Sequence, residues 1–232
     1  MINFSEQEII AIYLSLKIAT SAALISLPFG IVLAFILARK NFPLKAFITS
    51  IINLPLILPP VVTGYVLLII FGANGIIGKF LLDQFNFTFS FKWTGAALAC
   101  SIMGFPLMVR AIRLSIEMVD TKIEEAAKTL GASPMRVFFS ITLPIALPGI
   151  IVGTVLSFAR ALGEFGATIT FVSNIPGETQ TLSTAIYTFL QAPNGEYMAL
   201  RITIISIIIS LTALVISELI LDRLIVKDKK NE

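Results

Sequence analysis

The sequence contains no histidine and a single cysteine, Cys100, which lies inside an apolar run. One cysteine cannot form a disulfide within the chain, and zinc sites built from cysteine or histidine need more such ligands than are present. Nucleophiles that depend on a histidine base are excluded as well. We therefore predict no catalytic residue and no metal site, and a function that depends on shape, carboxylates, hydroxyls and backbone groups.

Charged residues are also scarce. They make up 13% of the 232 residues, whereas 56% are hydrophobic, and a water-soluble domain carries charge on roughly a quarter of its residues. This composition predicts that lipid surrounds much of the chain. The net charge of +3 does not indicate nucleic acid as a partner, because the basic residues lie beside apolar runs, where positive charge marks cytoplasmic loops.

Long apolar runs are what the sequence has in place of charge. A helix needs about 20 residues to cross a hydrocarbon layer of ~30 Å. Five runs meet this length, or come near it, at residues 9–38, 46–71, 93–109, 139–159 and 202–220. We predict an all-α integral membrane protein with about five spanning helices.

Lysine and arginine are distributed unevenly between the loops. They gather in residues 39–45, in residues 110–136 and in the tail, and such loops stay in the cytoplasm. We therefore expect the N-terminus outside and the C-terminus in the cytoplasm. Residues 1–8 form the outer N-terminus in this scheme, residues 9–221 the transmembrane domain, and residues 222–232 the cytoplasmic tail.

Residues 162–200 are apolar but broken by glycine and proline, so no span of twenty residues fits them. Irregular backbone at membrane depth survives only where protein or a wet cavity covers it. The segment predicts re-entrant or outer-face pieces, with a short helix at residues 182–190. A plain outer loop is nearly as well supported for its middle part.

The cytoplasmic stretch TKIEEAAKTLGASPMRVFFSITLP, residues 121–144, carries the clearest local signals. Thr121 with Glu124 predicts a capping box at the start of a short helix, which Gly131 ends. Ile123, Ala126 or Ala127, and Leu130 recur at helical spacing and give this helix an apolar side. Ser133 and Pro134 then predict the start of the next helix. The result is an elbow that either fits a groove on another protein or packs on its own chain.

The elbow resembles a known family. Glu125, Ala126, Ala127 and Gly131, followed by Ile141 and Leu143–Pro144, match the EAA-loop pattern of binding-protein-dependent importer permeases. The resemblance implies a type I importer transmembrane domain in the bacterial inner membrane, with a periplasmic N-terminus and a cytoplasmic coupling helix in a loop at 121–138. It implies that an ATPase subunit docks on the residues that follow: Glu125, Ala126, Ala127, Gly131, Ser133 and Arg136.

The same resemblance implies the partners. They are a second copy of the chain, two ATP-binding-cassette ATPase subunits and a periplasmic oxyanion-binding protein. The chain's nearest phosphate-loop lookalike, residues 72–80, has Ala73 in place of the first glycine and Phe80 in place of Ser or Thr. We therefore expect no cofactor on this chain, with ATP and Mg²⁺ bound by the partner.

A second group of residues is a candidate for the pathway or gate. Arg160 and Glu164 are spaced for an ion pair on one helix. A carboxylate near the membrane is a functional candidate, and for Glu164 we favour a structural or gating role. Hydroxyls could line a path for an oxyanion or simply cap turns, and prolines could give a pivot or a static kink. The full set is Pro59, Pro60, Glu164, Thr168, Thr170 and Ser183.

Three segments narrow the resemblance to the permeases of molybdate importers. They are PLILPPVVTGY at 55–65, FPLMVRAIR at 105–113 and GEFGATITFVSNIPGET at 163–179. Sulfate permeases share a similar GEFGA segment, and tungstate is an oxyanion of equal charge. The alternatives are therefore a sulfate- or tungstate-type permease, or a secondary transporter driven by an ion gradient.

Overall fold

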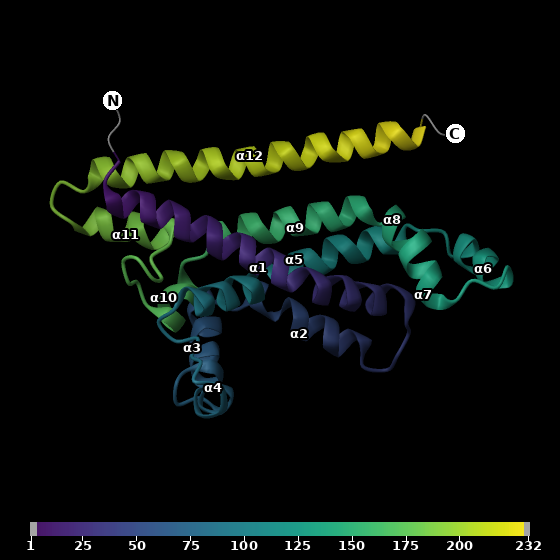
Figure 1. Ribbon diagram of the computed structural model, residues 1–232, viewed down its shortest axis with the longest axis horizontal. Helices are drawn as coiled ribbons and strands as arrows, with labels where there is room; N and C mark the ends of the chain where they lie inside the picture. The colour runs from purple at the N-terminus through teal and green to yellow at the C-terminus, as the bar shows by residue number, and fades with distance from the viewer. Residues whose placement is uncertain (1–3, 230–232) are drawn as a thin grey trace.

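The computed structural model describes residues 4–229, and within this range the chain is helical with no β-strand (Figure 1). The helices are α1 (Glu6–Arg39), α2 (Lys45–Ile57), α3 (Pro60–Phe71), α4 (Ile76–Phe85), α5 (Trp93–Glu117), α6 (Thr121–Thr129), α7 (Pro134–Val137), the π-helical segment η1 (Phe138–Thr142), α8 (Leu143–Ile145), α9 (Leu147–Leu162), α10 (Gly166–Val172), α11 (Leu182–Gln191) and α12 (Glu196–Lys229).

Three helices, α1, α5 and α12, are long and apolar enough to cross a membrane singly. Two further spans are possible if each of two bent pairs counts as one: α2 with α3, which meet at 114°, and Pro134–Ile145 with α9, which meet at 68°. The chain therefore has three to five candidate spans, in agreement with the predicted fold class.

The predicted spans at 46–71 and 139–159 each consist of helices that meet at a sharp bend. In the first, Leu58 and Pro59 have extended backbone between α2 and α3. A residue that precedes proline is driven out of the helical region, and Pro59 and Pro60 follow in succession. In the second, the chain bends at Ala146, directly before the first turn of α9 and its Pro148.

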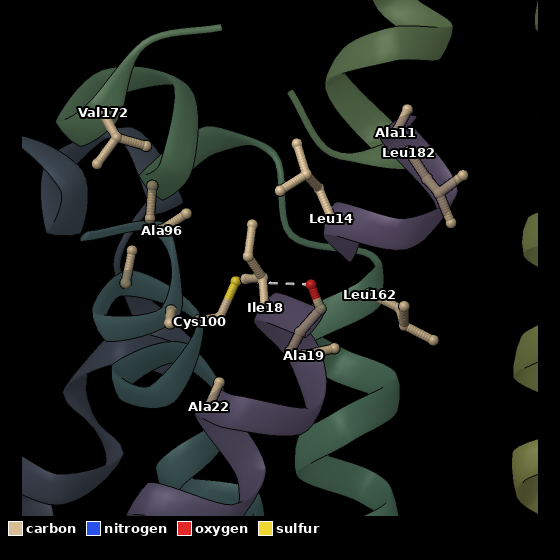
Figure 2. Close-up of a cluster of buried hydrophobic side chains, with 14 of the residues drawn as sticks. Ala11, Leu14, Ile18, Ala19, Ala22, Ala96, Cys100, Leu162, Val172 and Leu182 are labelled. Carbon is tan, nitrogen blue, oxygen red and sulfur yellow. Dashed lines mark hydrogen bonds between the residues drawn. The ribbon is translucent and has the colours of Figure 1, made fainter. Parts of the chain in front are cut away.

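The core of the molecule lies where α5 packs between α1 and α9. Many of its buried side chains are small, among them Ala11, Ala19, Ala22, Ala96 and Cys100, and they bring the helices close together (Figure 2). Gly149 and Gly153 of α9 lie against Ser115 and Met108 of α5. These two glycines therefore allow close packing of α9 on α5.

The two ends of the bundle differ. The described N-terminal residues, α11 and the start of α12 lie at one end, and α6 and α7 lie at the other, toward which α12 also runs, while α3 and α4 project to one side (Figure 1). Ser5 and Glu8 form a capping box at the start of α1, so residues 6–8 belong to that helix. The predicted tail is helical as far as Lys229; residues 1–3 and 230–232 lie outside the described residues.

Candidate coupling elbow and pathway

The elbow begins one residue earlier than predicted. The N-cap of α6 is Asp120, whose Oδ1 accepts a hydrogen bond of 2.9 Å from the backbone N–H of Lys122. Thr121 is the first residue of the helix, so the predicted capping box of Thr121 with Glu124 is wrong. The capping box does not form because the Glu124 side chain turns inward, where its Oε1 lies 2.9 Å from Arg39 Nη2.

The end of α6 agrees with the prediction. Gly131 has a φ of +87°, its N–H donates to the Lys128 carbonyl, and the N–H of Ala132 donates to the Ala127 carbonyl. This is a Schellman ending, which favours glycine at the left-handed position. Ser133 then accepts from the N–H of Arg136 at 3.3 Å and Pro134 opens α7, so the turn between the helices is defined by hydrogen bonds.

Large apolar residues of α6 and its C-cap remain exposed in the described part of the chain. Ile123 is 49% exposed and Leu130 is 88% exposed. The coupling residues predicted on this elbow are exposed too, except Ala127, which is half-buried. This exposed side is available for contact with another protein, and the coupling role of these residues stays a prediction.

A buried polar cluster connects the elbow to the bundle, and sequence reasoning missed it. Glu124 Oε1 accepts from Arg39 Nη2 at 2.9 Å and from Thr142 Oγ1 at 2.7 Å. Arg39 Nη2 also donates to the Val119 carbonyl at 3.0 Å. Arg39 and Glu124 are 85 residues apart in the chain, so no local spacing could have indicated the pair.

The predicted pathway residues gather where α3 meets α10. A Cβ on Gly166 would lie 2.8 Å from Pro60 Cβ, and one on Gly64 would lie 2.9 Å from Thr170 Cβ. These two glycines permit the contact, which brings Pro59, Pro60, Thr168 and Thr170 into one region. Ser183 lies on a different helix, at the start of α11, where its hydroxyl donates to the Leu162 carbonyl at 3.3 Å.

The predicted ion pair of Arg160 and Glu164 is present. Arg160 Nη1 lies 2.7 Å from Glu164 Oε2, and the carboxylate side chain is 1% exposed. Glu164 Oε1 also accepts from the N–H of Ala167 at 2.8 Å, in the first turn of α10. Glu164 therefore stabilises the start of α10 and the turn that precedes it, and its structural or gating role stays a prediction.

The hydroxyls of the predicted path are engaged by the backbone. Thr168 donates to the Phe165 carbonyl at 2.9 Å, Thr170 to the Gly166 carbonyl at 2.8 Å and Ser183 to the Leu162 carbonyl at 3.3 Å. An anion needs hydrogen-bond donors, and in this conformation the three protons are already used. The geometry agrees with the turn-stabilising role that the sequence left open.

Two grooves lie beside α2. The larger, of about 640 Å³, is lined almost entirely by apolar side chains of α1, α2, α5 and the loop after α4. The smaller, of about 200 Å³, is lined in part by Thr49, Asn53, Arg110 and Arg113. These arginines and Asn53 were not among the predicted pathway residues, although only the smaller groove offers cationic groups to an oxyanion.

Comparison with known proteins identifies the architecture. Residues 26–226 match the family of binding-protein-dependent transport system inner membrane components. The chain belongs to this family. It is a permease and a multi-pass protein of the inner membrane, in agreement with its apolar helices.

Relatives that are named for different substrates differ in how similar they are to this permease. It is 61% identical over 208 residues to the Molybdenum transport system permease protein ModB of Escherichia coli (strain K12), covering 90% of this chain and 91% of that one. It is 40% identical over 172 residues to the Sulfate transport system permease protein CysW of Synechococcus elongatus, covering 74% and 60%.

Among solved structures, the permease is similar to a bacterial ABC transporter involved in the import of the acidic polysaccharide alginate. The TM-score is 0.73 at 19% identity, covering 95% of this chain and 80% of that one. At this identity the likeness shows a shared fold alone.

Proposed function

We propose that this permease is the membrane subunit of an ATP-driven molybdate importer and forms its translocation path. The observation that carries the proposal is the 61% identity to a molybdenum permease along 90% of the chain. The likeness to the sulfate permease, 40% over 74% of the chain, is weaker. An importer of sulfate or tungstate is the alternative within the same fold.

The chain is not itself an enzyme in this proposal. Two copies line one path, two ATPase subunits bind ATP and Mg²⁺ on the cytoplasmic side, and a periplasmic oxyanion-binding protein delivers the substrate. The exposed elbow supports such an ATPase contact, because its apolar residues Ile123 and Leu130 face away from the bundle. The elbow side is cytoplasmic in this arrangement, which places the N-terminus outside and the C-terminus inside.

The proposed mechanism is alternating access. Closure of the ATPase subunits displaces the elbow at Glu125, Ala126, Ala127, Gly131, Ser133 and Arg136, and the path opens outward to receive molybdate. The contact of α3 with α10 is the proposed gate, because Pro59 and Pro60 lie at the 114° bend between α2 and α3 and Gly166 packs directly on Pro60. Glu164 and the hydroxyls of Thr168, Thr170 and Ser183 hold the backbone of this gate in shape.

Uptake of radiolabelled molybdate by the reconstituted complex tests the proposal. We expect ATP-dependent uptake that unlabelled molybdate or tungstate reduces and sulfate does not. Stronger competition by sulfate would assign the permease to sulfate import. Uptake by the purified chain in liposomes without ATPase subunits would instead support a secondary transporter driven by an ion gradient.

A further inference from the structure

Helix α6 buries a carboxylate against its own chain, while large apolar residues on the elbow stay exposed. Within α6, all of which the structure describes, Glu124 is the only buried residue. An amphipathic helix ordinarily turns its apolar side toward the protein that carries it. Here Ile123 and Leu130 point outward, so the position of α6 relative to the bundle depends on what Glu124 contacts.

Glu124 contacts two other elements at once. Its Oε1 accepts from Arg39 Nη2, in the last residue of α1, and from Thr142 Oγ1, in the last residue of η1. The side chains of Arg39 and Glu124 are 13% and 7% exposed. Hydrogen bonds to a charged partner are about twice as strong as neutral ones, and burial shields this pair from salt screening.

The segment η1 is a π-helical interruption between α7 and α8, and such interruptions recur at functional sites. Its first residue, Phe138, packs edge-on against Phe35 of α1 at 4.9 Å between ring centroids. Both ends of η1 are thus connected to the last turns of α1. Phe138 contacts Phe35 directly, and Thr142 is connected to Arg39 through Glu124. Helix α1 in turn packs on α5 and α9.

We propose that Glu124 is the positioning residue that transmits movement of α6 to α1 and η1 together. This inference rests on the proposed function, in which an ATPase subunit moves α6. A displacement of α6 acts on the end of α1 through Arg39 and on the bend before α9 through Thr142. Glu125 and the exposed residues of the elbow bind the ATPase subunit, while Glu124 faces the opposite way and converts that binding into movement of the spans.

The test separates transport from ATP hydrolysis. The complex is reconstituted with Glu124→Gln or Thr142→Val, and molybdate imported per ATP hydrolysed is measured together with stimulation of the ATPase by the binding protein. We expect both variants to retain the ATPase subunits and basal hydrolysis, and to import at least fivefold less molybdate per ATP. Thr142→Val leaves the ion pair intact, so it also guards against a general folding defect in Glu124→Gln.

The matched control is Glu117→Gln. Glu117 pairs with Arg113 at 2.7 Å near the same end of the bundle, but this pair is partly exposed, and we expect import per ATP within twofold of the unmodified protein. The double variant Arg39→Glu with Glu124→Arg is expected to regain part of the coupling that either single reversal loses.

Wild-type import per ATP in both Glu124→Gln and Thr142→Val would overturn the inference, as would loss of the ATPase subunits from either variant, which would make Glu124 a docking residue. An unmodified complex that hydrolyses ATP in response to the binding protein but imports no molybdate would contradict the proposed substrate alone. In that case the stimulation of ATP hydrolysis by the binding protein, compared between the variants and the unmodified complex, would still test the role of Glu124.

Discussion

Gly131 occupies a backbone conformation that other residues reach only at a cost. Its φ is +87°, and apart from its neighbours in the chain no atom lies within 4 Å of where a Cβ would stand, so a side chain would meet backbone strain and not a collision. The left-handed region costs an L-residue roughly 1–2 kcal/mol. A substitution here therefore alters the angle between α6 and α7 without disturbing the core.

We expect Gly131→Ala to lower ATP-dependent molybdate uptake severalfold, while the protein still inserts in the membrane. Gly131→Pro should abolish uptake, because proline is confined to negative φ. Gly177→Ala is the matched control: its φ is +84° with equally open surroundings, but it lies far from the elbow. Uptake assays in proteoliposomes that showed equal losses for both alanine variants would contradict a specific role for Gly131.

A substitution at Glu125 tests the exposed side of α6, just as a substitution at Glu124 tests the buried side. Its side chain is exposed, so reversal of its charge should leave the fold intact and act on a bound partner. We expect Glu125→Lys to insert normally and to lose binding of the ATPase subunit, measured by co-purification from the membrane. Glu178→Lys, an exposed carboxylate near α10 and α11, should co-purify normally.

At the scale of elements, the contact of α9 with α5 depends on glycine. A Cβ on Gly149 would lie 2.2 Å from Ser115 Cβ and 2.9 Å from the Ala111 carbonyl oxygen. Overpacking of this kind costs about 1–3 kcal/mol. We expect Gly149→Ala to lower the melting temperature of the detergent-purified protein by several degrees.

Gly163→Ala serves as the control for this measurement. At Gly163 the nearest atom to a Cβ would be the Ala159 carbonyl oxygen at 3.9 Å, an ordinary van der Waals contact, so its melting temperature should match that of the unmodified protein. A Gly149→Ala protein as stable as Gly163→Ala would show that the two helices separate easily, and that their close approach adds little to stability.

The helices themselves were largely predictable, and their bends were not. Local signals that satisfy backbone groups, such as Gly131 and Ser133, indicated where α6 ends and α7 begins. Pro59 and Pro60 indicated an interruption, but the 114° angle also depends on how α3 packs on α10. A contact between distant elements also explains why the N-cap of α6 is Asp120 and not Thr121. Arg39 of α1 holds the Glu124 side chain, which a capping box with Thr121 would need.

At the scale of the whole molecule, one end is predicted to face the cytoplasm and the other the outer side of the membrane. The elbow lies at one end and α11 at the other (Figure 1). The positive loops at 39–45 and 110–136 lie toward the elbow end, where the positive-inside rule places the cytoplasm. The orientation is thus a prediction from hydropathy and charge, whereas contacts between distant parts of the chain, such as Glu8 of α1 with Arg201 of α12 at 2.9 Å, required the folded chain.

Single-cysteine labelling tests this orientation directly. Lys122 and Glu178 are both exposed, one on the elbow and one near α10 and α11, and the native Cys100 is fully buried, so it contributes little background. In spheroplasts treated with a membrane-impermeant maleimide, we expect Glu178→Cys to react and Lys122→Cys to react only after lysis. The reverse pattern would place the elbow outside, where no ATP is available, and would contradict the proposed contact with an ATPase subunit.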